Sequence, residues 1–278
     1  MPLVALLAAA PAAAALTPGR AAVLGAVQGL TEFLPVSSSA HLYIVPKLLG
    51  WTYEGVAFDV ALHAGTLVAL LLAFWRDWWD LVRNLFAADA PTRDQARKLW
   101  AWLIVATIPG GVAGLLLEKA ADTQLRDLRI QAVTLFVFGV LLWAADRFRP
   151  PGRDPEVPEM KTGLAMGFAQ ALALVPGVSR SGITITAGRL SGLSKISAAR
   201  FSFLLATPIT FAAVVLKLRH MPHDVPASSL AVGVITSAAV GLLAIRGLIR
   251  WLGRAGFGVF LAYRTALAAL LLVVILRG

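Results

Sequence analysis

The sequence predicts an all-α polytopic membrane protein with an inverted-topology repeat, in which each half is a re-entrant helical hairpin followed by three transmembrane helices. Three observations support this fold class. Of the 278 residues, 58% are hydrophobic and only 14% are charged, long apolar runs alternate with short polar loops, and one polar motif occurs twice. Because about a quarter of the residues in a soluble domain are charged, the composition favours a membrane protein.

Several apolar runs are long enough to cross a bilayer, since about 20 helical residues span a hydrocarbon core of about 30 Å. These runs are residues 56–75, 99–117, 130–145, 198–216, 228–249 and 257–276. The tryptophans lie at or near their ends, where amphipathic rings meet a membrane interface. The net charge of +10 comes from basic residues in the short connecting loops. Membrane lipids are therefore expected partners, and nucleic acid is not.

The repeated motif divides the chain into two halves. Residues 25–39, GAVQGLTEFLPVSSS, return as residues 167–181, GFAQALALVPGVSRS, and the two copies share Gly, Gln, Leu, Val and two Ser without a gap. Three apolar runs follow each copy. We predict a single integrated membrane domain over residues 1–278. It consists of an extension (1–20), a first repeat (21–147), a linker (148–160) and a second repeat (161–278).

Each copy of the motif predicts a re-entrant hairpin. Residues 21–34 would form a helix of about 21 Å, too short to cross, before Pro35 and the serine run break it and a second short apolar piece, residues 41–49, follows. Such a turn is tolerated at membrane depth only inside protein or beside a water-filled cavity. One hairpin plus three spans is an odd number of crossings, so the second half would be inverted and the two turns would face each other.

Gln28 and Glu32 are the first candidate site residues. They are four positions apart and share one helix face. A carboxylate inside an apolar hairpin indicates a functional site, as a metal ligand or general base. The alternative is a buried acid that loop amides satisfy.

The first turn adds hydroxyl groups and an imidazole, from Ser37, Ser38, Ser39 and His41. Histidine can shuttle a proton or attack phosphorus at neutral pH. A base beside a serine is the usual arrangement for activating a nucleophile. A structural role for His41 is the alternative.

The second turn, residues 176–184 with the sequence PGVSRSGIT, is typical of a phosphate site. Arg180 offers a planar fork of donors, the neighbouring hydroxyls add more, and glycine lets backbone amides approach closely. Thr184 would lie near a helix start, where anions are favoured. The alternative is an arginine that extends to the lipid headgroups. We expect Arg180 to meet Glu32 and His41 inside the bilayer.

Asp59 and His63 form a further polar pair on the first long apolar run. They could line the same cavity, form a proton or metal pair, or make an intramembrane hydrogen bond. These interpretations stay open at the level of sequence.

The two motifs resemble the signatures of the bacterial undecaprenyl-diphosphate phosphatase family, which is linked to bacitracin resistance. Residues 28–41, QGLTEFLPVSSSAH, are similar to its (E/Q)xxxE motif and following histidine, and residues 176–184 are similar to its PGxSRSxxT motif. The resemblance implies hydrolysis of undecaprenyl diphosphate to undecaprenyl phosphate and inorganic phosphate, which recycles a carrier lipid for cell-wall synthesis. It also implies a multi-pass protein of the bacterial plasma membrane and a divalent cation, Mg²⁺ or Ca²⁺. It leaves a homodimer open.

The resemblance also implies a role for each candidate residue. The catalytic residues would be Glu32, Ser38, His41 and Arg180, with either Ser38 or His41 as the nucleophile. The substrate-binding residues would be Gln28, Ser37, Ser39, Ser179, Ser181 and Thr184. Glu32 is the candidate metal ligand, together with Gln28, although the neutral amide of Gln28 replaces a glutamate of many family members. The alternative function is a polyprenyl-phosphate flippase or another inverted-repeat transporter.

Overall fold

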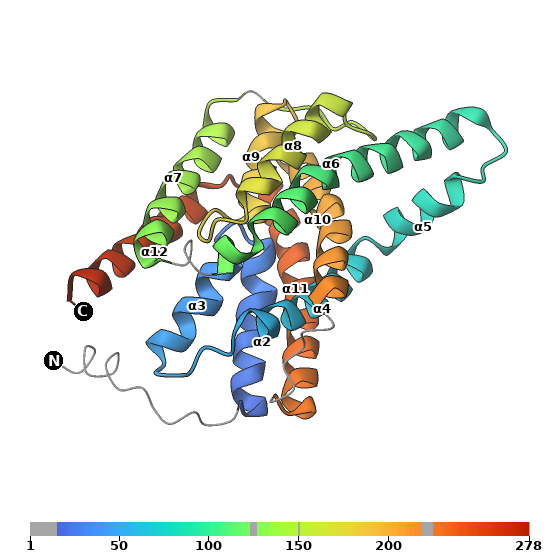
Figure 1. Cartoon of the computed structure of the whole chain (residues 1–278). Coiled ribbons are helices and arrows are strands. Elements are labelled where there is room, and N and C mark those ends of the chain that lie inside the picture. The colour runs from blue at the N-terminus through green and yellow to red at the C-terminus, as the bar shows by residue number, and fades with distance from the viewer. Residues whose placement is uncertain (1–15, 123–126, 150, 218–224, 278) are drawn as a thin grey trace.

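The computed structural model describes residues 16–122, 127–149, 151–217 and 225–277, and their regular elements are α-helices, apart from one isolated bridge between Arg153 and Leu193 (Figure 1). Residues 1–15 of the predicted extension lie outside the described residues. The helices are α2 (Pro18–Phe33), α3 (Ser38–Leu48), α4 (Val56–Ala73), α5 (Trp75–Asn84), α6 (Ala90–Asp122), α7 (Leu128–Arg147), α8 (Met160–Leu172), α9 (Arg180–Leu190), α10 (Lys195–Lys217), α11 (Ala227–Leu252) and α12 (Gly258–Arg277).

The prediction of an all-α polytopic membrane protein is confirmed. Among the described residues, 6 helices are long and apolar enough to cross a membrane, namely α4, α6, α7, α10, α11 and α12. They coincide with the predicted apolar runs. The largest difference is α6, in which the span begins at Ala90 rather than at residue 99.

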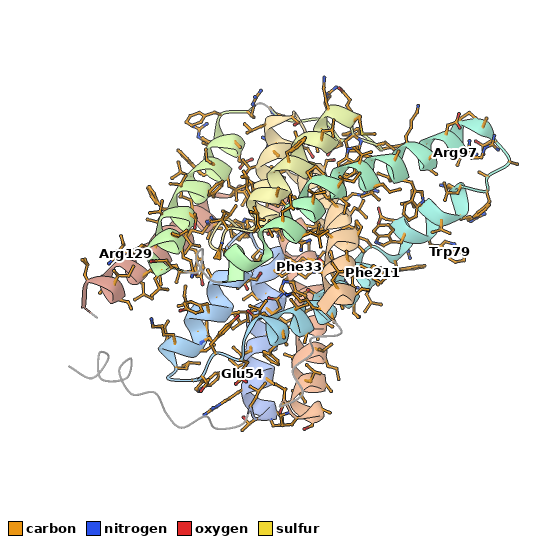
Figure 2. All side chains as sticks on the ribbon, in the orientation of Figure 1. Phe33, Glu54, Trp79, Arg97, Arg129 and Phe211 are labelled. Carbon is orange, nitrogen blue, oxygen red and sulfur yellow. The ribbon has the colours of Figure 1, made fainter. Side chains whose placement is uncertain are left out.

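The helix α5 and the first half of α6 project from the rest of the molecule as a helical hairpin (Figure 1). The helix α5 was not among the predicted elements. Its two neighbouring tryptophans and several charges fit a helix with one apolar and one polar side. Figure 2 shows Trp79 and Arg97 on this projecting pair, while Phe33 lies in the interior.

Two short helices pack against long spans at distances that only small residues allow. A Cβ on Gly25 of α2 would lie 2.3 Å from the carbonyl oxygen of Gly233 in α11, and a Cβ on Gly167 of α8 would lie 2.4 Å from that of Ala106 in α6. Small residues at such positions let membrane helices approach backbone to backbone. The helices α2 and α8 are therefore fixed against α11 and α6.

The ends of the short helices follow from local chemistry. The helix α2 ends at Phe33 because Pro35 cannot continue it and disfavours a helical residue before itself. The helix α3 then begins after Ser37, and α9 begins after Ser179, whose hydroxyl accepts a hydrogen bond from the Gly182 amide at 3.2 Å. The two connections, residues 34–37 and 173–179, lie near the middle of the molecule in Figure 1.

The segment between α7 and α8 is bound to the connection that precedes α10. The Arg153 amide donates to the Gly192 carbonyl at 2.9 Å, and the Ser194 amide donates to the Arg153 carbonyl at 2.8 Å. The carboxylate of Asp154 accepts from the hydroxyls of Ser194 and Ser197. These two hydroxyl donors lower the pKa of Asp154. This segment thus ties α7 and α8 to the start of α10.

One cluster of buried side chains contains residues that precede this segment in the sequence and residues that follow it. Phe33, Leu103 and Leu142 precede it, and Phe203 and Ile245 follow it. The ring of Phe33 meets that of Phe203 edge to face, with centroids 5.5 Å apart, a favourable arrangement for two aromatic rings. This contact joins α2 to α10.

Candidate active site

The two turns are hydrogen-bonded to each other. The Gly177 amide donates to the Ser37 hydroxyl at 3.2 Å, and the Ser181 hydroxyl donates to the Leu34 carbonyl at 3.4 Å. These contacts bring residues about 140 positions apart into one site. The two polar motifs therefore meet, as the sequence predicts.

Arg264 of α12 is hydrogen-bonded to the backbone of both turns. Its guanidinium donates to the carbonyls of Pro35 at 3.0 Å, Gly177 at 2.8 Å and Val178 at 3.2 Å, while Nε donates to the Leu135 carbonyl at 2.8 Å. The side chain is fully buried. Arg264 was not among the predicted site residues, although a charged residue within an apolar run is a recognisable signal of a buried polar site.

Ser37 and Ser179 share an unusual backbone conformation. Both have φ of 74°, and they are the only described non-glycine residues with positive φ. Such a conformation costs about 1–3 kcal/mol and persists where the surrounding structure enforces it. Each serine precedes the first residue of a helix, so the positive ends of α3 and α9 both reach the region between the turns.

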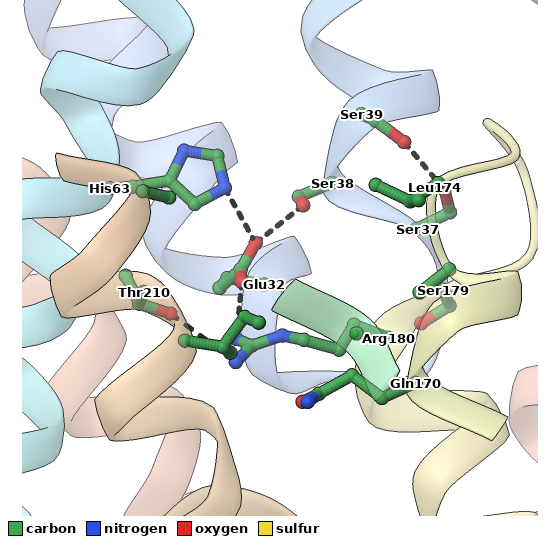
Figure 3. A pocket seen from close by; sticks show the side chains of 14 residues that line it. Glu32, Ser37, Ser38, Ser39, His63, Gln170, Leu174, Ser179, Arg180 and Thr210 are labelled. Atoms are coloured by element: carbon green, nitrogen blue, oxygen red, sulfur yellow. Dashed lines mark hydrogen bonds and ion pairs between the residues drawn. The ribbon is translucent and has the colours of Figure 1, made fainter. Parts of the chain in front are cut away.

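A cavity of about 240 Å³ lies between the turns and the neighbouring spans (Figure 3). Its polar lining residues are Glu32, Ser37, Ser38, Ser39, His63, Gln170, Ser179, Arg180 and Thr210. The remaining lining residues are Gly110, Ala173, Leu174, Ile209 and Ala213. Polar and apolar groups thus both line the cavity, and the charged groups among them are Glu32 and Arg180.

Glu32 is the centre of the polar contacts. Its Oε1 accepts from Arg180 Nη2 at 2.5 Å, and its Oε2 accepts from Ser38 Oγ at 2.5 Å and from Gln28 Nε2 at 3.1 Å. His63 Nε2 lies 3.5 Å from Oε2. The expected meeting of Arg180 with Glu32 is confirmed. The carboxylate can thus exchange a proton with a hydroxyl while it faces a fixed cation.

The imidazole that faces Glu32 is His63 rather than His41. His63 Nδ1 lies 2.7 Å from the Asp59 carbonyl, to which it donates, so Nε2 is left to face the cavity. The side chain of Asp59 instead accepts a hydrogen bond from Tyr53 at 2.5 Å. Of the interpretations left open for this pair, the structure supports a cavity position for His63.

His41 lies beside the first turn, and the expected contact with Arg180 is not formed. Its Nδ1 lies 2.7 Å from the Ser37 carbonyl and its Nε2 lies 2.6 Å from the Tyr263 hydroxyl, with the two rings stacked. Both ring nitrogens therefore have protein partners, and the ring is not among those that line the cavity. A catalytic role for His41 stays a prediction.

The other predicted site residues take two kinds of position. Ser37, Ser39 and Ser179 line the cavity, whereas Gln28, Ser181 and Thr184 lie outside its lining. The Thr184 hydroxyl is within 2.6 Å of that of Ser202 and donates to the Arg180 carbonyl at 2.8 Å. The hydrogen bond to the Arg180 carbonyl fixes the backbone that carries Arg180. Thr184 therefore acts on the site indirectly, by positioning Arg180.

The described residues of the site could hold a divalent cation together with the phosphates of a substrate. Among the described residues, no group of three or more His, Cys, Asp or Glu side chains could hold a metal ion. Mg²⁺, however, is commonly bound by one or two carboxylates together with substrate phosphates and water. Glu32 supplies one carboxylate, and Gln28 adds a buried Oε1 that has no hydrogen-bond partner in the described chain. This donor set fits a cation that arrives with a phosphate ligand.

Comparison with known proteins agrees with these observations. The family model described as bacitracin resistance protein BacA matches residues 21–270. A protein of Moorella thermoacetica named undecaprenyl-diphosphatase is 47% identical over 256 residues, which cover 92% of this chain and 97% of that protein. Proteins with the same name from Desulforudis audaxviator and Gemmatimonas aurantiaca are 47% identical over 270 residues and 48% identical over 256 residues. These alignments cover 95% and 91% of this chain, and 100% and 96% of the two relatives.

Proposed function

Since the chain belongs to the bacitracin resistance protein BacA family, we propose that the cavity between its two turns is where it hydrolyses undecaprenyl diphosphate to undecaprenyl phosphate and inorganic phosphate. The reaction takes place in a multi-pass protein of the bacterial membrane and returns a carrier lipid to cell-wall synthesis. A flippase or other transporter is not favoured, because relatives that align over nearly the whole chain are named for dephosphorylation.

One observation carries the proposed site: Arg180 is held 2.5 Å from Glu32, with a hydroxyl and an imidazole on the same carboxylate. A phosphate group that enters the cavity would compete with Glu32 for the guanidinium. Arg180 would then bind phosphate oxygens in a bidentate manner, and Glu32 would be free to act as a base. The exchange couples substrate binding to activation of the carboxylate.

Of the two candidate nucleophiles, Ser38 and His41, we propose Ser38. Ser38 lines the cavity and already donates its proton toward Glu32, whereas the nitrogens of His41 are bound elsewhere. In the first step, Ser38 Oγ bonds to the terminal phosphorus, the bond from that phosphorus to the bridging oxygen breaks, and Glu32 takes the hydroxyl proton. Undecaprenyl phosphate leaves with the electron pair of the broken bond.

The second step releases the phosphoryl group from the serine. Water attacks phosphorus as the bond from phosphorus to Ser38 Oγ breaks, Glu32 returns its proton to Oγ, and both hydrogens of the water leave with inorganic phosphate as dihydrogen phosphate. Arg180 and the positive ends of α3 and α9 stabilise the charge on the transferred group, which is the main requirement of phosphoryl transfer. His63 Nε2, on the opposite side of Glu32 from Arg180 in Figure 3, lies 3.5 Å from the carboxylate and orients it.

A divalent cation is proposed as a companion of the substrate. Glu32 and the oxygen of Gln28 would hold it next to the phosphates, where it would neutralise negative charge as the phosphoryl group moves. Glu32 lines the cavity, and Gln28, which lies outside the lining, is bonded to Glu32 and has an Oε1 without a hydrogen-bond partner in the described chain. These positions support the assignment.

We also propose that the two halves form an inverted repeat with two re-entrant hairpins, bounded by residues 21–147 and 161–278. Ser37 and Ser179, which are equivalent in the repeated motif, have the same φ of 74°. The equivalent glycines Gly25 and Gly167 allow α2 and α8 to pack closely on α11 and α6, each a long span of the other half. Such agreement is expected where a duplicated unit is arranged around a pseudo-two-fold axis.

The prenyl chain is proposed to follow an apolar groove of about 630 Å³ between α4, α6 and α10. Gly111 and Phe211 line this groove, while their chain neighbours Gly110 and Thr210 line the cavity. The same two helices thus border both spaces, so a substrate with its diphosphate beside Arg180 could place its first isoprene units in the groove. The apolar lining suits this chain, and the remainder would lie in lipid.

The purified protein in detergent tests the proposed function directly. Incubation with undecaprenyl diphosphate should release inorganic phosphate and leave undecaprenyl phosphate. A chelator should stop the release, and added Mg²⁺ or Ca²⁺ should restore it. Binding or transfer of the lipid across a vesicle membrane without phosphate release would contradict the proposal and favour the transporter.

A further inference from the structure

Gln170 is a buried polar residue of the cavity that the proposed mechanism does not use. It lies near the end of α8, and its side chain is only 4% exposed. Neither Nε2 nor Oε1 has a hydrogen-bond partner in the part of the chain that the structure describes. Buried amide groups are normally satisfied, since an unmade hydrogen bond costs free energy. Because Gln170 lines the cavity, its unbonded amide is available to a ligand that enters there.

The position of this amide is fixed by the surrounding helices. A Cβ on Gly110 of α6 would lie 3.0 Å from Gln170 Nε2, so the glycine leaves room for the amide against the α6 backbone. The close approach of Gly167 to Ala106 holds α8 in place one turn earlier. Gln170 is therefore held where it is by packing rather than by hydrogen bonds.

The equivalent residue of the first motif has a different environment. Gln28 donates to Glu32 and lies outside the cavity lining, whereas Gln170 lines the cavity. In Figure 3 the Gln170 amide lies on the side of Arg180 that is away from His63. One end of the polar surface thus carries Glu32 with its hydroxyl and imidazole partners, and the other carries a neutral amide.

We propose that Gln170 is a substrate-binding residue that recognises the second phosphate of a diphosphate. Its Nε2 donates to an oxygen of the phosphate nearer the lipid chain. Arg180 binds the terminal phosphate, which lies beside Glu32 and Ser38. A neutral amide suits this role because it binds phosphate oxygen without adding charge that would hold the monophosphate product. The inference rests on the proposed function and adds selectivity for a diphosphate over a monophosphate.

The test uses the whole protein in detergent with two probes that are not hydrolysed, methylenediphosphonate and methylphosphonate. Calorimetric titration should show that Gln170→Met weakens binding of methylenediphosphonate about tenfold, the loss expected for one hydrogen bond to a charged group, and changes binding of methylphosphonate less than about twofold. KM for undecaprenyl diphosphate should rise by a similar factor, with kcat nearly unchanged. Met166→Leu, on the same helix one turn earlier and fully buried, is the matched packing control.

Gln170→Asn, which keeps the amide but withdraws it by one methylene, should show the same selective loss and serves if the methionine variant does not fold. Unchanged binding of both probes would overturn the inference, since the amide would then meet only water. An equal loss for both probes would also overturn it. If the wild-type protein binds methylenediphosphonate through Gln170 but releases no phosphate from undecaprenyl diphosphate, the hydrolytic function fails and the binding role survives. Phosphate release with unaltered probe binding by Gln170→Met overturns only the binding role.

Discussion

Arg180 Nη2 lies 2.5 Å from Glu32 Oε1, although the two residues are separated by 148 positions and belong to different turns. Both side chains are largely buried. An ion pair formed away from water requires further hydrogen bonds to offset the loss of hydration. Ser38, Gln28 and Thr210 supply them. The ion pair is thus held in a network of hydrogen bonds from α2, α3 and α10.

Replacement of Arg180 by Ala should lower phosphate release by a factor of about 10³, because the main cation for the phosphate is lost. The rate of phosphate release by Arg180→Lys should lie between those of the wild-type protein and Arg180→Ala, because lysine keeps the positive charge but loses the bidentate geometry of the guanidinium. Phosphate release by purified protein measures the effect. Arg200→Ala is the control, because Arg200 pairs with Asp77 outside the cavity. Near-normal turnover by Arg180→Ala would remove Arg180 from the mechanism.

Replacement of Ser38 by Ala should lower kcat by a factor of about 10³ or more, as loss of a nucleophile does. Ser39→Ala should change kcat less than about threefold, since in the described part of the chain the Ser39 hydroxyl is paired with that of Ser37. Mass spectrometry after an acid quench should find phosphate on Ser38 of the wild-type protein. Phosphate on a histidine, or equal losses in both variants, would contradict the assignment.

Matched substitutions can distinguish the roles of the two histidines near the site, His41 and His63. His63→Gln should lower kcat/KM by a factor of about 10², because the group that faces Glu32 is lost. In His41→Gln the new amide can still bond the Ser37 carbonyl and Tyr263, so the main effect should be a loss of about 1 kcal/mol of stability. Phosphate release and thermal unfolding measure the two effects. The reverse ranking would support the catalytic role predicted for His41.

Arg264→Met should lower the free energy of unfolding by about 3 kcal/mol or more, because several buried carbonyls of both turns lose a charged donor. Activity should fall with it as the turns lose their relative position. Thermal unfolding in detergent is the measurement. Arg246→Met, on the exposed side of α11, should leave the midpoint nearly unchanged. An unchanged midpoint for Arg264→Met would show that the turns hold each other without α12.

The groove proposed for the prenyl chain can be filled from one helix position. Gly111 lines the groove and Gly114 does not, and a Cβ at either position meets nothing within 4 Å. Gly111→Phe should therefore raise KM for undecaprenyl diphosphate about tenfold, whereas Gly114→Phe should change it less than about twofold. Binding of methylenediphosphonate should be equal in both variants. Equal KM values for the two variants would show that the prenyl chain does not lie in this groove.

The spans and the broken turns were readable from the sequence because both follow from local properties. Apolar length predicts a membrane helix, and Pro35 or Pro176-Gly177 ends one. The repeated motif also predicted that Glu32 and Arg180 would meet. Both residues could be recognised as functional from the sequence, because a charged side chain inside a bilayer is costly and needs a partner.

Only the tertiary structure decided which imidazole and which further polar groups reach that pair. His41 is next to the serines in sequence, but the direction of its ring is set by Ser37 and by Tyr263 on α12. His63 reaches Glu32 because α4 packs beside α2, and Arg264 reaches both turns from the last helix. The physical reason is that side-chain direction depends on helix rotation and packing, which arise from contacts between distant parts of the chain and leave no local pattern.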